Sequence, residues 1–325
     1  MQPRISIIIP CYNLGSYLDG CLLSIQKQSH IDNVEYIFVN DGSTDDTLEK
    51  LQIFSSANPY VKVINQSNGG VSSARNKALE NANGDYVYLL DGDDMLSDNA
   101  ITLMLEAIED NPDIIFSPLQ RLRDNQIYNR PLDINNGVYT VDEIISNNTI
   151  FPIAPQPIYK RKLLEEFKIR FNPLLSVGEV LDFTFKVMMR ANRIKITDKP
   201  FFIYVLRTSG SATQQPNVKK DLSIIDSIRE YQKTLGERFH HPFFLIPIYK
   251  LLMSFTYNKY IRNKLKGEEI YKALTHLRNN INVRKILKEV TRYKLTSRKD
   301  KFLAWYFLNT GISGYKFLIK FNLPR

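Results

Sequence analysis

The stretch Tyr86-Val87-Tyr88-Leu89-Leu90-Asp91-Gly92-Asp93-Asp94 is a short apolar run that ends in three carboxylates within four residues. A continuous apolar run of this length before a turn is typical of a strand buried on both faces of a parallel sheet. Three carboxylates so close together repel one another, and a hard divalent cation such as Mg²⁺ or Mn²⁺ would relieve the repulsion. The alternative is an ordinary polar turn before a helix, with Asp94 or Ser97 as the N-cap.

Three similar apolar runs precede this stretch, and apolar residues at helical spacing follow each of them. We expect strands at residues 5–10, 34–39 and 61–64, and helices at residues 17–25, 45–54 and 71–82. Strands and helices that alternate in this order predict an α/β fold, a doubly wound, mostly parallel sheet flanked by helices. Ligands of such sheets bind outside the carboxyl ends of the strands. The expected site is therefore built from the loops at residues 11–13, 40–43 and 91–94.

Two further side chains near these loops suit a nucleotide. Asp41 can accept hydrogen bonds from the N–H and O–H donors of a nucleoside, although an Asp-Gly pair is also a common turn. Arg75 follows the turn at residues 67–70 and can pair with phosphate, although an arginine on a helix is as often solvated. With Asp91 and Asp93 they describe one nucleotide-diphosphate pocket. The sequence has no GxGxxG after the first strand and no GxxxxGK[ST], so it supports neither a usual dinucleotide fold nor a P-loop.

The composition is that of a globular protein. The chain has 325 residues, 43% of them apolar, and a net charge of +9 with histidines neutral. A disordered or fibrous protein is thereby excluded, and the length allows one large α/β domain with an appendage, or two domains. Cys11 and Cys21 are too few for a disulfide framework and form neither a zinc nor a CxxC pattern. We expect two buried free thiols and a reducing compartment.

The charge is divided unevenly along the chain. Residues 1–218 carry a net charge of −6, and residues 219–325 carry +15. We predict a first domain at residues 1–215 and a basic, mainly helical C-terminal region at residues 216–325, with a loop at residues 208–217 as the boundary. A strongly basic segment usually faces a polyanion, which is either nucleic acid or an anionic membrane surface.

The apolar stretches of the C-terminal region are interrupted by Pro247 and by the polar residues and glycines of residues 309–314. We therefore expect no membrane-spanning helix, and the N-terminal apolar run is too short for a signal peptide. Three interpretations of the region remain: a helical cap on the first domain, homo-oligomerisation, and contact with anionic lipid through the aromatic and basic residues of 299–320. We expect a cytoplasmic protein, peripheral on the inner face of the cytoplasmic membrane if the lipid contact forms.

Four motifs identify a family. They are Ile7-Ile8-Ile9-Pro10-Cys11-Tyr12-Asn13, Val39-Asn40-Asp41-Gly42-Ser43-Thr44-Asp45, Asn68-Gly69-Gly70-Val71 with Ala74-Arg75-Asn76, and Leu89-Leu90-Asp91-Gly92-Asp93-Asp94. In order and spacing they resemble the family 2 glycosyltransferases of the GT-A fold, of the type that makes bacterial polysaccharides, capsules or teichoic acids. The resemblance covers residues 1 to about 210 and includes residues 158–164 and 169–171.

The resemblance implies an inverting, metal-dependent transferase that moves a sugar from a nucleotide-sugar, most often a UDP-sugar, to a hydroxyl of a glycan or lipid-linked glycan. Residues 1–110 would form its nucleotide-binding half and residues 111–215 its acceptor half. The residues carried over to the donor site are Pro10, Tyr12, Asn13, Asp41, Asn68, Arg75, Asp91, Gly92 and Asp93. Asp93, together with Asp91, would hold Mn²⁺ or Mg²⁺, and Tyr204 and Arg207 would lie on the acceptor side.

The catalytic base is where this sequence departs from the family. The family usually has Gly-Glu-Asp at the place of Gly178-Glu179-Val180, with that aspartate as the base, and valine cannot accept a proton. Glu179 and Asp182 are three residues apart and would share one helical face, so either could reach the acceptor. We favour Asp182, because a slip of one turn restores the usual spacing to an aromatic residue, Phe185. The alternative is that Asp182 is structural.

A second class of function is a non-catalytic nucleotide- or polyanion-binding protein whose basic C-terminal region binds nucleic acid. The sequence contains no zinc-finger, RNP or helix-turn-helix signature, so we do not expect nucleic acid as a partner. Because four ordered motifs agree, the leading prediction is a hexosyl- or N-acetylhexosaminyltransferase that works in cell-surface polysaccharide synthesis.

Overall fold

The computed structural model of the chain describes residues 3–146, 156–206, 217–255, 260, 267–294 and 296–321, without the side chains of residue 31 and residues 311–321. The chain forms two compact units. The first contains residues 1–144, 154–173 and 186–206, and the second contains residues 145–153, 174–185 and 207–325. The domain boundary predicted at residue 215 stays a prediction.

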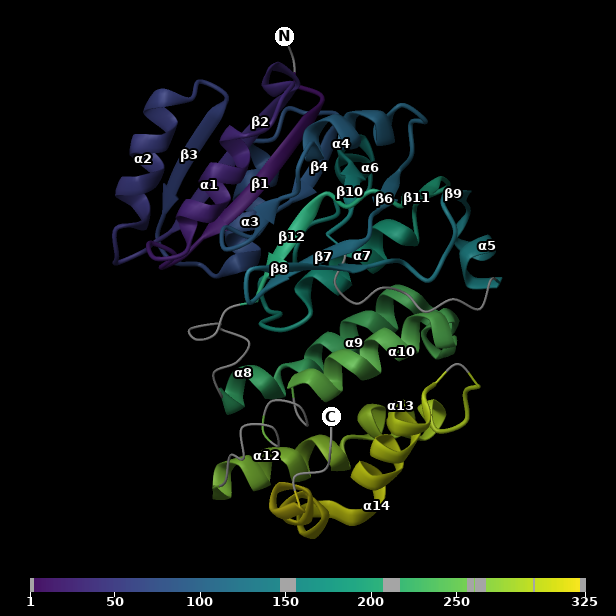
Figure 1. The fold of residues 1–325 in the computed structure, drawn as a ribbon. Coiled ribbons are helices and arrows are strands. Elements are labelled where there is room, and N and C mark those ends of the chain that lie inside the picture. Colours follow the sequence, from purple (N-terminus) through teal and green to yellow (C-terminus); the bar gives the residue numbers. More distant parts are fainter. Residues whose placement is uncertain are drawn as a thin grey trace. The chain divides into compact units, whose positions relative to one another are not determined.

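The first unit is built on an eight-stranded sheet with the strand order β3-β2-β1-β4-β10-β6-β11-β9 (Figure 1). Its strands are β1 (Ile5–Cys11), β2 (Val34–Asp41), β3 (Val61–Gln66), β4 (Tyr86–Leu89), β6 (Ile114–Phe116), β9 (Gly137–Tyr139), β10 (Ile158–Lys160) and β11 (Ile194–Ile196). The first four strands pair in parallel, as does β11 with β6. In contrast, β10 runs antiparallel to β4 and β6, and β9 runs antiparallel to β11. The predicted mostly parallel, doubly wound sheet is confirmed.

Helices cover both faces of this sheet because its strands are apolar on both sides. Side chains of a strand alternate between the two faces, and Ile5, Ile7 and Ile9 of β1 join one core cluster with residues of α1 (Leu18–Gln26), α2 (Thr47–Ala57) and α4 (Ala100–Ile108). The helix α3 (Val71–Glu80) packs on β1 and β2. Shorter helices complete the unit: η1 (Ile31–Asn33), α5 (Val141–Ser146) and α6 (Arg161–Glu166). The strands and helices predicted in the first hundred residues are confirmed, with ends that differ by at most a few residues.

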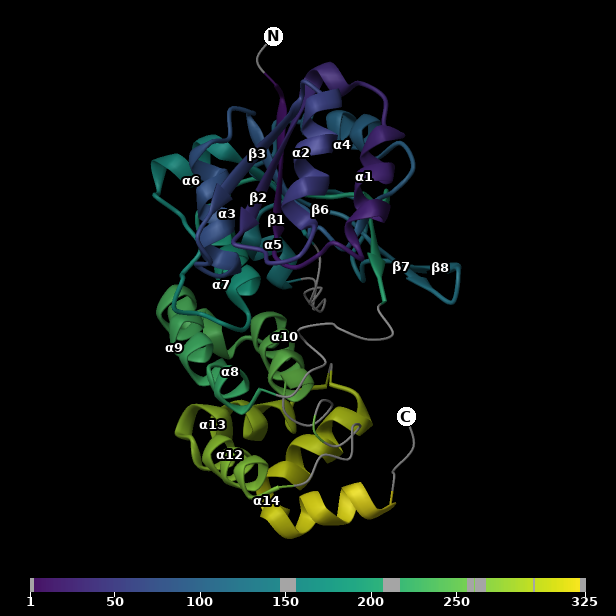
Figure 2. The same cartoon turned by 90° about the vertical axis from the view of Figure 1, so that its left-hand side faces the viewer.

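The first unit also contains a second, four-stranded sheet. Its order is β5-β12-β7-β8, formed by β5 (Met95–Leu96), β12 (Phe202–Val205), β7 (Leu119–Arg123) and β8 (Gln126–Arg130). The strands β7 and β8 form a hairpin that extends away from the large sheet (Figure 2). Every residue of β8 is exposed.

The described part of the second unit is helical, as predicted for the C-terminal region. Its helices are α7 (Glu179–Met188), which begins in this unit, α8 (Val218–Leu222), α9 (Ile224–Leu235), η2 (Gly236–His240), α10 (Pro242–Met253), α12 (Glu268–Asn279), α13 (Ile281–Val290) and α14 (Arg298–Phe321). The helix α13 packs against α9, α10, α12 and α14, and its buried residues Val283, Ile286 and Leu287 lie at the centre of this packing. Among the described helices, none combines the length and the apolarity that crossing a bilayer demands.

Candidate active site

The acidic loop after β4 is fixed by a close approach at Gly92. A Cβ atom on Gly92 would lie 2.8 Å from Cδ1 of Leu14 and 3.0 Å from Sγ of Cys11, so a larger residue here would force Leu14, Cys11 or the acidic loop to shift. The backbone N–H of Asp94 donates to the Asp91 carbonyl at 2.9 Å and closes the turn. Asp91 and Asp93 thus flank a glycine that holds both against the carboxyl end of the sheet.

The three carboxylates of this loop have different environments. Asp94 is buried, and its Oδ1 accepts a hydrogen bond from the Val205 N–H of β12 at 2.9 Å. The helix-cap interpretation is wrong: α4 starts after Asn99, and the Ser97 hydroxyl donates to the Pro200 carbonyl. Asp91 and Asp93 remain partly exposed. Asp94 therefore ties the loop to the small sheet, whereas the other two aspartates keep part of their surface exposed.

Asp91 is held on both oxygens. Its Oδ1 accepts from Nη2 of Arg75 at 2.8 Å, and its Oδ2 accepts from Nε2 of Gln156 at 3.1 Å. Arg75 is only 4% exposed, and its guanidinium lies 5.3 Å from the centroid of the Phe171 ring. The side chain of Asn76 both donates to and accepts from the Phe171 backbone, which fixes that ring. The solvated-helix alternative for Arg75 is thus wrong.

Gln156 was missed by the sequence reasoning. It lies 65 residues from Asp91 in a stretch without periodicity, and no local pattern marks it. Its amide is buried, and its Oε1 has no hydrogen-bond partner among the described residues. The amide therefore presents one unused acceptor beside Asp91.

Asp41 organises the loop in front of α3. Its Oδ1 accepts from the Gly69 N–H at 2.8 Å and from Nε2 of Gln66 at 2.7 Å, and its Oδ2 accepts from the Gly70 N–H at 2.8 Å. A carboxylate offers about four acceptor positions, so these three bonds leave one position unused on the buried Asp41 side chain. The exposed Asn68 lies on this same loop.

The loop after β1 is tied to the loop after β2. The Asn13 N–H donates to the Ser43 hydroxyl at 3.0 Å, and the Asn13 Oδ1 accepts from the Thr44 N–H at 2.8 Å. Asn13 therefore uses both its backbone and its amide to join the two loops. Tyr12, half-exposed, and Pro10, partly buried, lie beside it at the carboxyl end of β1.

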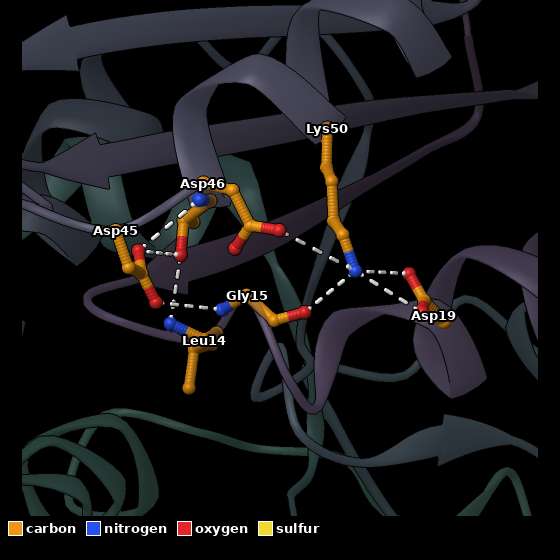
Figure 3. Close-up of polar contacts among 7 residues, drawn as sticks. Leu14, Gly15, Asp19, Asp45, Asp46 and Lys50 are labelled. Atoms are coloured by element: carbon orange, nitrogen blue, oxygen red, sulfur yellow. Dashed lines mark hydrogen bonds and ion pairs between the residues drawn. The ribbon is translucent and has the colours of Figure 1, made fainter.

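A polar cluster fixes the β1–α1 loop, where the Leu14 N–H donates to the Thr47 hydroxyl at 2.8 Å (Figure 3). The Gly15 N–H donates to Oδ2 of Asp45 at 2.9 Å, and Nζ of Lys50 donates to the Gly15 carbonyl at 2.7 Å and to Asp19 at 2.9 Å. Burial raises the pKa of Asp45, but the hydrogen bonds from Thr47 and Gly15 outweigh it and lower the pKa overall. The ionised Asp45 thus fixes the path of the β1–α1 loop.

The carboxylates of the acidic loop impose a negative field on their neighbours. Burial, and then the charges of Asp93 and Asp91, raises the pKa of Cys11 far above its ordinary value, and burial with the charges of Asp94 and Asp91 does the same for Tyr88. Cys11 and Cys21 are buried free thiols, as predicted. A field of this sign favours a bound cation.

The donor set at the acidic loop fits a hard divalent ion. The described residues contain no group of three or more His, Cys, Asp or Glu side chains placed to hold a metal. Mg²⁺ and Mn²⁺ are commonly held by one or two carboxylates together with substrate phosphates. Asp93 and Asp91 supply that number of carboxylates, and the field at the loop has the right sign.

The acidic segment of the second unit is held by α9. The Tyr231 hydroxyl donates to the Gly178 carbonyl at 2.8 Å, and the Ser227 hydroxyl donates to the Val177 carbonyl. Gly178 has a φ of +77°, and α7 begins at the next residue, Glu179. Burial raises the pKa of Tyr231, and the charges of Glu179 and Asp182 raise it further.

The two candidate bases differ in burial. Asp182 is fully buried, whereas Glu179 and Val180 are partly exposed at the start of α7. On the acceptor side, Tyr204 lies on β12, and Arg207 falls outside the described residues. The roles of these residues stay predictions.

A sequence model of the family described as Glycosyl transferase family 2 matches residues 6–168, half of the chain. The chain belongs to this family. The uncharacterized glycosyltransferase EpsJ of Bacillus subtilis (strain 168) is 31% identical to it over 212 residues, which are 63% of this chain and 61% of EpsJ. The Poly(ribitol-phosphate) beta-glucosyltransferase of Bacillus spizizenii is 27% identical over 211 residues, 64% of this chain and 33% of that relative. The matched part thus spans about three fifths of the length of EpsJ and one third of the length of the other relative.

Solved structures share the fold. S. aureus TarS 1-349 in complex with UDP-GlcNAc gives a TM-score of 0.71 at 23% identity, over 98% of this chain and 90% of that chain. The mannosyltransferase PcManGT from Pyrobaculum calidifontis, in complex with GDP-Man and Mn2+, gives 0.56 at 16% identity, over 100% and 89%. These likenesses show that the family 2 chain has the GT-A fold expected from its motifs.

Proposed function

We propose that this chain is an inverting glycosyltransferase that moves a hexosyl or N-acetylhexosaminyl group from a UDP-sugar to a hydroxyl of a glycan or lipid-linked glycan in cell-surface polysaccharide synthesis. The observation that carries the proposal is the pair Asp91 and Asp93, held by Gly92 at the carboxyl end of β4. Asp41 and Arg75 lie at the same edge of the sheet, where a nucleoside and a diphosphate would bind. TarS has been solved with UDP and with UDP-GlcNAc, which supports a UDP-sugar donor here.

In this proposal the donor's diphosphate lies beside the bonded pair of Arg75 and Asp91 at the acidic loop. Mn²⁺ or Mg²⁺, held by Asp93 and Asp91, would neutralise the negative charge that builds on the leaving diphosphate. PcManGT, solved with Mn2+, supports a divalent ion. Asp41 would accept from the nucleoside on its remaining lone pair, with Asn68 beside it, while Pro10, Tyr12 and Asn13 would line the edge of the nucleoside pocket. Gln156 would keep Asp91 in place through its amide N–H.

The base must accept a proton from the acceptor hydroxyl as that oxygen attacks the anomeric carbon. Such a group has to be reachable by the acceptor. Glu179 is partly exposed and Asp182 is fully buried, so burial favours Glu179, against the sequence-based preference for Asp182. We therefore propose Glu179 as the base. Its backbone is positioned by the bonds from Tyr231 and Ser227 to the two preceding carbonyls.

Three variants separate these assignments. Glu179→Gln removes the proposed base and is expected to lower kcat by about 100-fold or more, the usual contribution of general base catalysis, with the UDP affinity unchanged. Val180→Asp restores the family's usual aspartate at a partly exposed position, and we expect it to raise kcat. If Asp182→Asn lowers kcat as strongly as Glu179→Gln while the protein melts normally, Asp182 is the base instead.

The exposed face of α14 supports a peripheral membrane position on the cytoplasmic side. Phe302 and Trp305 are 47% and 53% exposed, with ring centroids 6.5 Å apart, and the Phe302 ring lies 5.6 Å from that of Tyr306. Arg298 and Lys299 are exposed at the start of the same helix. Aromatic rings beside basic residues suit the interface of an anionic bilayer. We propose that this face contacts anionic lipid.

Vesicle sedimentation tests the lipid contact. The double variant Phe302→Ser with Trp305→Ser should lose binding to vesicles of phosphatidylcholine with phosphatidylglycerol, and the matched control Leu23→Ser with Ile53→Ser, which also removes two exposed apolar side chains, should retain it. Equal binding by both variants contradicts the proposal. Concentration-dependent association that the first variant alone abolishes would show that the face joins two copies of the chain.

A donor screen tests the transferase itself. The chain is incubated with a panel of UDP-sugars, with and without Mn²⁺, and UDP release and UDP binding are measured. We expect metal-dependent binding that Asp93→Asn abolishes and that Asp98→Asn, an exposed aspartate five residues away, preserves. Absence of metal-dependent UDP binding and of any donor turnover would refute the proposed function.

A further inference from the structure

The small sheet carries a row of arginine and tyrosine side chains on one face. The strand register places Tyr204 of β12 opposite Arg121 of β7, and Arg121 opposite Tyr128 of β8. Residues directly opposite each other, and residues two apart on one strand, share a face. The same face therefore includes Arg123 and Arg130, two residues from Arg121 and Tyr128. These five residues are called the Arg/Tyr face below.

Contacts within the Arg/Tyr face agree with this register. The Arg121 guanidinium lies 6.0 Å from the centroid of the Tyr204 ring. Burial lowers the pKa of Arg121, and the charge of Arg130 lowers it further, so the two arginines repel each other. The Tyr128 hydroxyl donates to Oε1 of Gln126, which faces Arg123 across the hairpin.

Two of the three arginines of this face, Arg121 and Arg130, lack counterions within the described chain. No described carboxylate forms an ion pair with Arg121 or Arg130, and the buried Nε of Arg121 has no hydrogen-bond partner there. Arg123 pairs at 3.2 Å with Asp124, and both side chains are exposed. Two like charges that share a surface without a carboxylate are stabilised by an external anion. Because an arginine presents a fork of N–H donors, phosphate or carboxylate groups fit best.

The opposite face of the same sheet has a different character. There the side chains of Gln120 and Asn129 bond to each other at 2.9 Å, and Leu122 lies opposite Ile127. That face is neutral. The positive charge is thus concentrated on one side of a hairpin that extends from the first unit (Figure 2).

The Arg/Tyr face begins beside the acidic loop. Val205, the neighbour of Tyr204, donates its N–H to Asp94 at 2.9 Å. Burial raises the pKa of Tyr204, and the charges of Asp94 and Asp93 raise it further, which places the phenol within the field of the loop. A chain molecule lying along the hairpin would therefore have one end next to the candidate metal ligands.

We propose that the Arg/Tyr face binds the acceptor, and that the acceptor is a glycan chain with repeated anionic groups, either phosphodiesters or carboxylates. The assignment to the acceptor rests on the proposed transferase function. The arginines bind the anionic groups, and Tyr128 and Tyr204 supply flat apolar surface with a polar hydroxyl for the sugar units between them. The neutral side of the hairpin does not take part.

Fluorescence anisotropy with labelled oligomers of equal length tests the proposal on the full chain. The probes are a glycerol-phosphate oligomer, an oligogalacturonate and a neutral dextran oligomer. We expect one or both anionic probes to bind and the neutral probe not to bind, with affinity falling as salt rises. The anionic probe that binds more tightly identifies the source of the anionic group.

Variants locate the binding site. Arg121→Gln and Arg130→Gln should each lower the affinity for the anionic probe by about tenfold, which is the usual effect of losing a hydrogen bond to a charged group. Arg121→Lys keeps the charge but loses the forked N–H donors, so its affinity for the anionic probe should lie between those of the parent and of Arg121→Gln. Arg4→Gln is the matched control: it removes the same charge from the first unit, at an arginine that pairs with Glu109 at 2.6 Å, and should leave the affinity unchanged.

Four results would overturn the proposal: no binding of either anionic probe, equal binding of the neutral probe, an equal loss in Arg4→Gln, or tighter binding of single-stranded RNA than of both glycans at the Arg/Tyr face. UDP-sugar binding by the unchanged chain is measured in parallel. If the anionic probe binds at the Arg/Tyr face but no UDP-sugar binds, the transferase proposal fails and the anion site stands. If UDP-sugars bind and turn over but the anionic probes do not bind, the transferase proposal stands and the proposed anion site fails.

Discussion

Gly92→Ala is the sharpest test of how the site is built. The added Cβ would lie 2.8 Å from Cδ1 of Leu14, 3.0 Å from Sγ of Cys11 and 3.4 Å from the Pro10 carbonyl oxygen. The leucine methyl can rotate away, but the thiol and the carbonyl belong to β1, which is buried in the sheet, so the acidic loop must shift instead. Overpacking of this kind costs about 1–3 kcal/mol of stability. A displacement of roughly 1 Å at reacting groups costs about 100-fold in rate, so a shift of a few tenths of an ångström at the acidic loop should lower kcat/KM for the donor by less than that.

Thermal melting and donor turnover are measured on the same preparations of Gly92→Ala. The control is Gly20→Ala in α1, where the new Cβ would lie 3.7 Å from the Met95 side chain, an ordinary contact, and where alanine is favoured over glycine by up to about 1 kcal/mol. The control should melt no lower than the parent and turn over donor normally. If Gly92→Ala melts and turns over donor like the parent, the loop is not held as described.

Three further outcomes are expected. Gln156→Leu removes the N–H donor to Oδ2 of Asp91, and kcat/KM should fall about tenfold with a smaller change in melting temperature; an unchanged rate would show that Asp91 needs no support from this side. Tyr231→Phe removes the hydrogen-bond donor to the Gly178 carbonyl, which precedes the proposed base Glu179. We expect kcat to fall while the UDP affinity, measured by titration, stays the same. A loss of UDP affinity instead would contradict a role confined to the base. The pKa of Asp45 is lowered in the folded chain, so its contribution to stability is present above the unfolded pKa and is lost as pH falls through the folded pKa. Melting curves from pH 7 to pH 3 should therefore show a smaller acid-induced fall in melting temperature for Asp45→Asn than for the parent. Identical falls in melting temperature would refute this.

The first hundred residues could be predicted from the sequence because their signals are local. Each strand from β1 to β4 contains a short, mostly apolar run, and polar turn residues follow it. The antiparallel strand β10 (Ile158–Lys160) inserts between β4 and β6, and no apolar run followed by turn residues predicts it. Three residues are too few for a period, and their pairing depends on partners 40 or more residues away in the chain. Sequence patterns therefore located the helices and strands better than the order of the sheet.

In the candidate site, too, local sequence signals predict some features, and contacts between distant residues determine the others. The acidic loop was evident because three aspartates crowd into four residues, but the sequence could not distinguish their roles. Asp94 is buried and accepts the Val205 N–H, a contact that spans 111 residues, whereas Asp91 accepts from Arg75 and Gln156. Gln156 and Phe171, which hold Asp91 and Arg75, are likewise distant in the chain. A residue's type shows what it can bind, and only the tertiary structure shows which bonds are already used.

The proposed catalytic base shows most clearly what the sequence cannot distinguish. Two candidate carboxylates look alike in sequence, and their burial reverses the preference that the sequence spacing gives. Asp182 and Glu179 are both carboxylates on the first turn of α7, and spacing to an aromatic residue favoured Asp182. A fully buried carboxylate can accept a proton only from a group that reaches it, and desolvation makes its charged form costly. Val180, in the place of the family's aspartate, is partly exposed like Glu179. Of the two carboxylates, the partly exposed Glu179 is therefore the one proposed as the base.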